Sequence, residues 1–189
     1  MRKPKDKVIF AFIFILIMGC VHAKDGRNCP DVPPEVKTQR SLMKPIVEAL
    51  FMNHNQLKYL YSDIHELARG PLFRSDRQLD YVQKAALYMN EAYLIGHSEW
   101  KLLSIMEYIK PEVVQDYYTL RKKGLTEAIQ EIQYSIKQIE LYKNFINDRA
   151  AVKIIQDAVG VIDANIYMMN KLLELVTPLS ASEFSGHGS

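Results

Sequence analysis

Residues 151–178, with the sequence AVKIIQDAVGVIDANIYMMNKLLELVTP, decide the fold. Large apolar side chains recur there at alternating spacings of three and four residues. They are Val152, Ile155, Val159, Ile162, Ile166, Met169, Leu173 and Val176. This period matches the 3.6 residues per turn of an α-helix, so the segment predicts one long amphipathic helix. Asp148 stands where an N-cap residue is expected, and Pro178 cannot continue the helix.

The same repeat occurs in three earlier segments. Together the four segments predict helices over about 41–69, 75–109, 111–147 and 149–177. Because the connections are very short, neighbouring helices are expected to be antiparallel. The predicted fold is all-α, an antiparallel up-down-up-down four-helix bundle of long helices over residues 41–177. A dimeric coiled coil of two helical hairpins is the main alternative.

Two local patterns refine this prediction. Ser75-Asp-Arg-Gln78 has the form of a capping box at the start of the second helix. In the third segment the apolar stripe through Val113, Tyr117 and Leu120 is one position out of phase with the stripe that begins at Leu125. A kink, a bulge or a short break over residues 122–124, which end in a glycine, would absorb this shift.

The amino terminus has the pattern of an export signal. A basic start precedes an unbroken apolar run over residues 8–18. Eleven residues are too few to span a bilayer as a helix, which takes about 20, but they suit the h-region of a signal peptide. Residues 1–19 are therefore predicted to be a signal peptide, and the chain is expected to be exported.

The segment Ile17-Met18-Gly19-Cys20 resembles the lipobox of bacterial lipoprotein precursors, in which the cysteine receives the lipid. The resemblance covers about 20 residues, and Met18 is untypical of it. It implies that a lipid on Cys20 anchors the chain in the cell envelope, facing the periplasm or the cell surface. Cleavage after Ala23 by an ordinary signal peptidase, giving a soluble periplasmic or secreted protein, is the alternative.

The segments on either side of the bundle have different compositions from it. Residues 20–40 contain Pro30, Pro33 and Pro34 and are predicted to be an extended tether. Cys29 lies in this tether and is interpreted as a linker cysteine without a role. Residues 178–189 are rich in serine and glycine and are expected to be disordered.

Charge separates the leader from the rest of the chain. Residues 1–19 carry a net charge of +3, whereas the whole chain carries +2, so the remaining residues are close to neutral at −1. Nucleic-acid binding normally requires a basic domain, and the mature chain is not basic. No nucleic-acid partner is therefore expected.

The sequence lacks the motifs of the enzymes and cofactor proteins that use this fold class. It has no Cys-x-x-Cys-His, no Glu-x-x-His pair and no His-Glu-x-x-His, so neither a cofactor nor an enzymatic activity is expected. His54 and His97 are the candidate metal ligands. Folding the first hairpin pairs residue i with roughly 145 − i, which places His54 near Glu91 and His97 near Glu48. Both histidines are interpreted as flanking residues beside the apolar stripe.

Polar or small residues within the stripes outline a possible ligand pocket between the first two helices. Asn53 occupies a core position opposite Tyr93, and Gly96 and Trp100 follow on the second helix. The simpler interpretation is that Asn53 sets the register and Gly96 makes room for a large neighbour. Eleven tyrosines are many for this length and suit either core borders or a partner-binding surface.

These observations favour a membrane-anchored envelope lipoprotein that acts as a non-enzymatic helical interaction or scaffold module. Its expected partners are membrane lipid through Cys20 and another envelope protein or a second copy of the chain. The alternative is a periplasmic binding or sensor bundle for a small ligand, a metal or haem.

Overall fold

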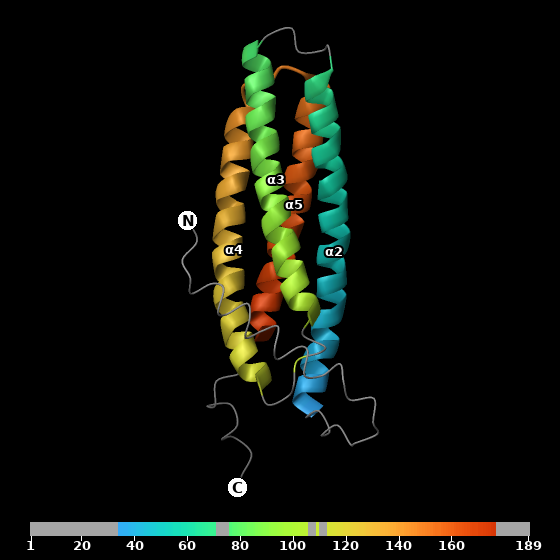
Figure 1. Cartoon of the computed structure of the whole chain (residues 1–189), viewed down its shortest axis with the longest axis vertical. Coiled ribbons are helices and arrows are strands. Elements are labelled where there is room, and N and C mark those ends of the chain that lie inside the picture. Colours follow the sequence, from blue (N-terminus) through green and yellow to red (C-terminus); the bar gives the residue numbers. More distant parts are fainter. Residues whose placement is uncertain (1–33, 71–75, 106–108, 110–112, 177–189) are drawn as a thin grey trace, which may run out of the picture.

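The computed structural model describes residues 34–70, 76–105, 109 and 113–176. These residues form four helices, which are α2 (Pro34–Arg69), α3 (Asp76–Ser104), α4 (Val114–Lys143) and α5 (Arg149–Val176). The described ranges contain no β-strand (Figure 1). The all-α prediction is confirmed, and α3 and α4 are each several residues shorter than predicted.

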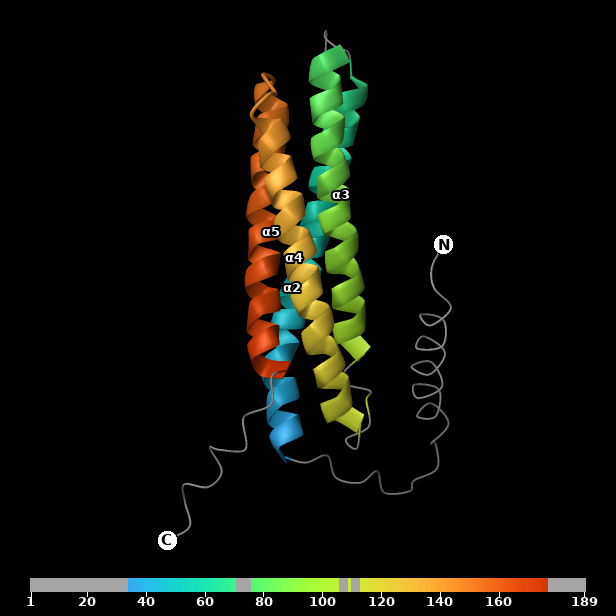
Figure 2. The ribbon, with the colours of Figure 1, turned by 90° about the vertical axis from the view of Figure 1, so that its left-hand side faces the viewer.

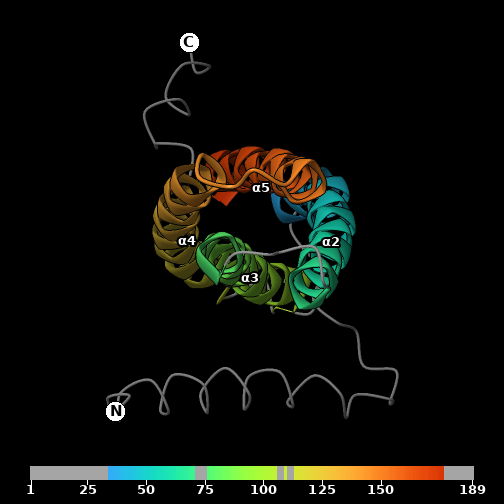
Figure 3. The same cartoon turned by 90° about the horizontal axis from the view of Figure 1, so that it is seen from above.

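The four helices surround a common core. Seen from above, they follow one another around the axis in chain order, and α5 closes the ring against α2 (Figure 3). Each helix packs along its two ring neighbours, as the side view in Figure 2 also shows. This pairing is that of a four-helix bundle.

The apolar stripes point into this core. On α5, Ile155, Ile162, Met169 and Val176 are all buried, as the repeat in residues 151–176 predicts. They meet buried residues of the other helices, among them Leu57, Met89 and Ile132. Burial of such a continuous apolar core is the main source of stability for long helices, whose intrinsic propensity is marginal.

Helix α2 begins seven residues before the predicted start, so the prediction of a tether over residues 20–40 is wrong for its last part. Proline is tolerated at the start of a helix because the first N–H groups have no intrahelical partner, and Pro34 occupies that place. The extra turns are also held by tertiary contacts. Gln39 Nε2 donates to the carbonyl of Leu175, Arg40 donates to the carbonyl of Ile109, and Met43 is buried.

The connection between α4 and α5 is held by two polar side chains. Asp148 Oδ1 accepts a hydrogen bond of 2.8 Å from the backbone N–H of Ala151, which confirms the predicted cap. Gln78 has a different role from the one predicted for it. Its Nε2 donates to the carbonyl of Phe145 at 2.8 Å, and its Oε1 accepts from the N–H of Asn147 at 2.9 Å. Ser75 of the expected capping box lies outside the described residues.

The phase shift predicted within α4 does not exist. The helix is continuous through Gly124, and the inward-facing row includes Tyr117, Arg121 and Leu125. Arg121 is buried, whereas Leu120, which the sequence places in the stripe, is 45% exposed. The true stripe therefore passes through an arginine. Gly124 leaves space for its side chain, because a Cβ there would lie 2.5 Å from the Arg121 guanidinium.

Candidate functional site: a histidine–aromatic cluster between α2 and α3

Five rings from two helices form a continuous stack, here called the histidine–aromatic cluster. It consists of Phe51 and His54 from α2 and Tyr93, His97 and Trp100 from α3. The ring centroids of His54 and Tyr93 lie 4.3 Å apart, those of His54 and His97 4.5 Å, and those of Phe51 and Trp100 4.8 Å. The cluster fills the α2–α3 seam with polarisable rings in place of aliphatic side chains.

A direct hydrogen bond between two imidazoles lies at the centre of the cluster. His97 Nδ1 and His54 Nε2 are 2.9 Å apart. One ring must donate and the other, which must be neutral, must accept, because two protonated rings would have no acceptor between them. His54 is only 5% exposed, and its Nδ1 is buried with no hydrogen-bond partner in the described part of the chain.

The surroundings keep both rings neutral. Burial, followed by the nearby His97, Lys58 and Lys101, lowers the pKa of His54 to about 4. Burial, followed by the charge of Lys101, also lowers the pKa of His97. Both imidazoles are therefore free bases at neutral pH. The hydrogen bond between them uses the lone pair of one ring, and the lone pair of the other ring is available to a proton or a metal.

The predicted carboxylate neighbours of the two histidines are not found beside them. Glu91 accepts a hydrogen bond from Ser135 of α4, and Glu48 lies at the rim of a hollow described below. The interpretation of His54 as a flanking residue is also wrong, since it is buried in the core. Helical side chains lean toward the N-terminus of their own helix. On two antiparallel helices, the side chains that meet therefore belong to residues whose numbers add up to more than the sum for Cα atoms at the same height.

The four residues of the predicted pocket do not line one cavity. Tyr93 and Trp100 belong to the histidine–aromatic cluster. Asn53 faces the other side of α2, where it lines a hollow with Gly160 of α5. Gly96 is buried, and a Cβ there would lie 3.7 Å from Asn165 Nδ2.

The buried polar residue near Gly96 is Asn165. It is 2% exposed, and its Oδ1 has no hydrogen-bond partner among the described residues. Asn165 was not singled out from the sequence, because it lies beside the apolar stripe that was used to find the core.

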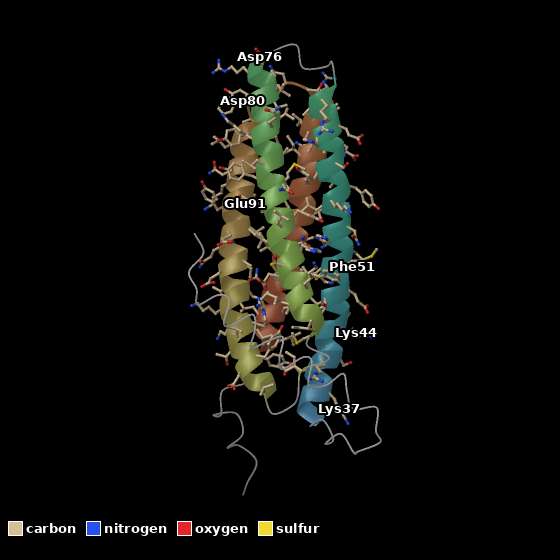
Figure 4. All side chains as sticks on the ribbon, viewed as in Figure 1. Lys37, Lys44, Phe51, Asp76, Asp80 and Glu91 are labelled. Carbon is tan, nitrogen blue, oxygen red and sulfur yellow. The ribbon has the colours of Figure 1, made fainter. Side chains whose placement is uncertain are left out.

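An apolar hollow of about 300 Å³ adjoins the cluster on the half of the bundle nearer to Pro34. We call it the α2–α3 hollow. Met43, Val47, Phe51, Trp100 and Leu103 form its walls. Arg40, Lys44, Glu48 and Ser104 contribute polar groups at its edge. In Figure 4, Lys44 is labelled on the lower part of α2 and Phe51 near its middle.

A second group of aromatic residues lies along the α3–α4 seam. Tyr81 lies 5.1 Å from Phe145 and 6.5 Å from Tyr142, and Tyr88 lies 6.1 Å from Tyr142 and 6.2 Å from Tyr134, measured between ring centroids. We call these five residues the tyrosine ladder. Its two ends are open to solvent, since Phe145 is 49% and Tyr134 is 54% exposed.

A buried ion pair crosses between α3 and α4 below the ladder. Arg121 Nη2 donates to Glu99 Oε2, and both side chains are buried. Burial raises the pKa of Glu99 despite the opposing effect of Arg121. Neither charge was singled out from the sequence, because both residues lie outside the apolar stripes that were used to find the core.

The described residues contain no group of three or more histidine, cysteine, aspartate or glutamate side chains placed to hold a metal ion. The His54–His97 pair alone offers two nitrogen ligands, and its nearest charged neighbours, Lys58 and Lys101, are cations that oppose a metal ion. Cys20, Ala23 and Cys29 lie outside the described residues, so the lipid anchor remains a prediction. Within the described ranges no helix has the length and apolar character needed to cross a bilayer.

No protein-family model matches the chain, and no curated protein or solved structure is significantly similar to it.

Proposed function

We propose that the chain is a lipid-anchored protein of the bacterial cell envelope whose up-down-up-down four-helix bundle acts as a non-enzymatic interaction module. The lipobox-like segment ending at Cys20 supports the anchor. A tether over residues 20–33 would then connect the anchor to the start of α2. Release of a soluble protein after Ala23 is the alternative that this proposal excludes.

The observation that carries the proposal is the position of the tyrosine ladder. Its residue Tyr81 directly follows Asp80 on α3, and Figure 4 labels Asp76 and Asp80 at the end of the bundle opposite Lys37. Helix α2 has 36 residues and spans about 54 Å at 1.5 Å per residue. An anchor before Pro34 would therefore hold the ladder far from the membrane surface, where a partner can reach it.

The surface beside the ladder has the composition of a protein-binding site. Leu87 and Leu94 of α3 are 62% and 52% exposed. Leu87 directly precedes the ladder residue Tyr88, and Leu94 follows Tyr88 by six residues. Two adjoining hollows between α3 and α4 share Leu94 and Glu131, and Glu91 and Glu127 lie at their edges. Tyrosine is enriched at protein interfaces, and exposed carboxylates select a basic partner.

We therefore propose that the partner is another envelope protein that presents an amphipathic segment with lysine or arginine beside apolar anchors. The exposed leucines would receive the anchors, and the glutamates would pair with the basic side chains. Such a helix-in-groove arrangement uses the spacing of successive helical turns on both surfaces.

Site-specific photocrosslinking in living cells tests this proposal. A photoreactive amino acid at Leu87 or Tyr134 is expected to capture one defined envelope protein. The matched control is Tyr167 of α5, which is 58% exposed but lies away from the ladder. Equal capture from Tyr167, or no capture from either Leu87 or Tyr134, would contradict the proposal.

The anchor is tested separately by intact-mass analysis of the protein extracted from membranes. A mass that includes acyl chains on an amino-terminal Cys20 is expected. An unmodified chain that begins at Lys24 would refute the anchor and leave the interaction surface to be judged by crosslinking.

The His54–His97 pair favours a second candidate function, a periplasmic binding or sensor module for a metal or haem. Two neutral imidazoles on neighbouring helices would supply two ligands. This candidate predicts that Cu²⁺, Zn²⁺ or haem raises the melting temperature of the native chain and that His97→Ala abolishes the rise. An unchanged melting temperature with all three would exclude it.

A further inference from the structure

The α2–α3 hollow is separate from the tyrosine ladder and has no place in the interaction described above. Its walls are formed by five apolar or aromatic residues, Met43, Val47, Phe51, Trp100 and Leu103. Its volume of about 300 Å³ falls at the lower end of the range typical of small-molecule sites, which are likewise mostly apolar with a few polar groups.

The shape of the hollow follows the axis of α2. Its lining residues on this helix run from Arg40 to Phe51, which at 1.5 Å per residue corresponds to about 16 Å. This is close to the length of an extended twelve-carbon chain. An elongated apolar space of this kind accepts a linear hydrocarbon better than a compact ring system.

The charges at the edge select the head group of such a ligand. Arg40 and Lys44 are cations, and Glu48 is the one carboxylate among the lining residues. The guanidinium of Arg40 is held by its hydrogen bond to the carbonyl of Ile109. Its positive charge therefore stays at the edge of the hollow. Lys44 is exposed on the turn below Glu48, and its ammonium is available to an anion at the end of the hollow nearer to Pro34.

We propose that the α2–α3 hollow binds one free medium-chain fatty acid, with the hydrocarbon between Phe51, Trp100 and Val47 and the carboxylate beside Lys44. This inference does not depend on the proposed interaction module. The cluster of His54 and His97 lies next to the far end of the hollow, since Trp100 is 5.6 Å from His97 between ring centroids.

Trp100 makes the test direct, because it is the only tryptophan of the chain and lines the hollow. Purified, detergent-free protein is titrated with dodecanoate brominated near its methyl end, below the concentration at which it forms micelles. The expected result is saturable quenching of tryptophan fluorescence at one ligand per chain. Quenching that rises linearly without saturation would overturn the proposal.

Two ligand comparisons test the chemistry. Each buried methylene contributes about fourfold in affinity, so decanoate is expected to bind roughly fifteenfold more weakly than dodecanoate in competition. Dodecanol, which has the same chain without the charge, is also expected to compete more weakly. Equal competition by dodecanol would show that the carboxylate is not recognised and would overturn that part of the proposal.

Two pairs of variants test the location. Val47→Phe fills the hollow and is expected to abolish saturable quenching, whereas Val159→Phe, a half-buried valine of α5, is the matched control. Lys44→Glu is expected to weaken dodecanoate binding roughly fivefold. The control is Lys37→Glu, an exposed lysine of the same helix that does not line the hollow. Binding unchanged in Val47→Phe, or weakened equally by Lys37→Glu, would overturn the proposed site.

Discussion

His97 Nδ1 lies 2.9 Å from His54 Nε2, and the two imidazoles join α2 to α3 inside a stack of aromatic rings. The hydrogen bond requires that at least one ring is neutral. The groups that face the pair are Tyr93 and Trp100, with Lys58 and Lys101 as the nearest charges. No carboxylate is among the groups that shift the pKa of His54, so protonation has no counter-charge there.

This arrangement predicts acid sensitivity of the bundle. The pKa of His54 is about 4 in the folded chain and about 6.5 in the unfolded chain, so the unfolded state takes up protons first as the pH falls. The stabilising effect is fully present above pH 6.5 and is lost as the pH falls toward 4. Between pH 7 and pH 4.5 the loss from this residue is expected to be about 2 kcal/mol.

Urea denaturation at both pH values checks this prediction. The variant His54→Phe keeps an aromatic ring that cannot be protonated. Between pH 7 and pH 4.5, the free energy of unfolding should therefore fall less for this variant than for the unaltered chain. His65→Phe, at an exposed position of the same helix, is the control. The same pH dependence in His54→Phe and in the unaltered chain would show that the pair is not responsible.

Because Glu99 and Arg121 form a buried ion pair, we expect the effect of removing one charge on stability to depend strongly on whether the other charge is present. Removal of one partner leaves an uncompensated buried charge, so Glu99→Leu or Arg121→Met alone is expected to cost about 3–5 kcal/mol. The double variant is expected to be more stable than either single variant. A double-mutant cycle by urea denaturation measures this coupling, and single effects that simply add would contradict it.

Two glycines predict opposite effects of the same substitution. Alanine is favoured over glycine within a helix by up to about 1 kcal/mol. At Gly96 the new Cβ meets only Asn165 Nδ2 at 3.7 Å, so Gly96→Ala should raise the melting temperature. At Gly124 it lies 2.5 Å from the guanidinium of Arg121, which is buried and paired, so Gly124→Ala should lower stability by about 1–3 kcal/mol.

Thermal denaturation of Gly96→Ala and Gly124→Ala measures both changes in stability. Stabilisation in both would mean that the Arg121 side chain moves aside at no cost. Destabilisation in both would mean that Gly96 is packed more tightly than its neighbours indicate.

Much of the fold follows from the sequence, because apolar periodicity reports burial directly. The stripe from Val152 to Val176 identified α5 within one residue, and Asp148 identified its cap. The start of α2 was misplaced because Pro34 breaks helices in general but is tolerated in a first turn that tertiary contacts then hold.

The candidate site was less predictable, because its polar residues are buried only where they pair with polar residues on other helices. His54 and Arg121 look like surface residues until the partners His97 and Glu99 are placed beside them. Tyr93 and Trp100 were predicted to line a ligand pocket with Asn53 and Gly96, but the exact register of α2 against α3 depends on the direction in which side chains lean. One-dimensional periodicity contains no information about that lean.

The proposed partner surface gives a final prediction about charge. Glu131 lies in both hollows beside the tyrosine ladder, and no ion pair is formed by it among the described residues. Glu131→Lys is therefore expected to abolish crosslinking from Leu87, because it places a lysine against a basic partner. Asp163→Lys, at an exposed position of α5, introduces the same charge away from the ladder and should leave crosslinking intact. Both variants should keep the unfolding free energy within about 0.5 kcal/mol of the unaltered chain, as exposed substitutions usually do. Crosslinking that survives Glu131→Lys would show that the partner does not recognise the carboxylates of this groove.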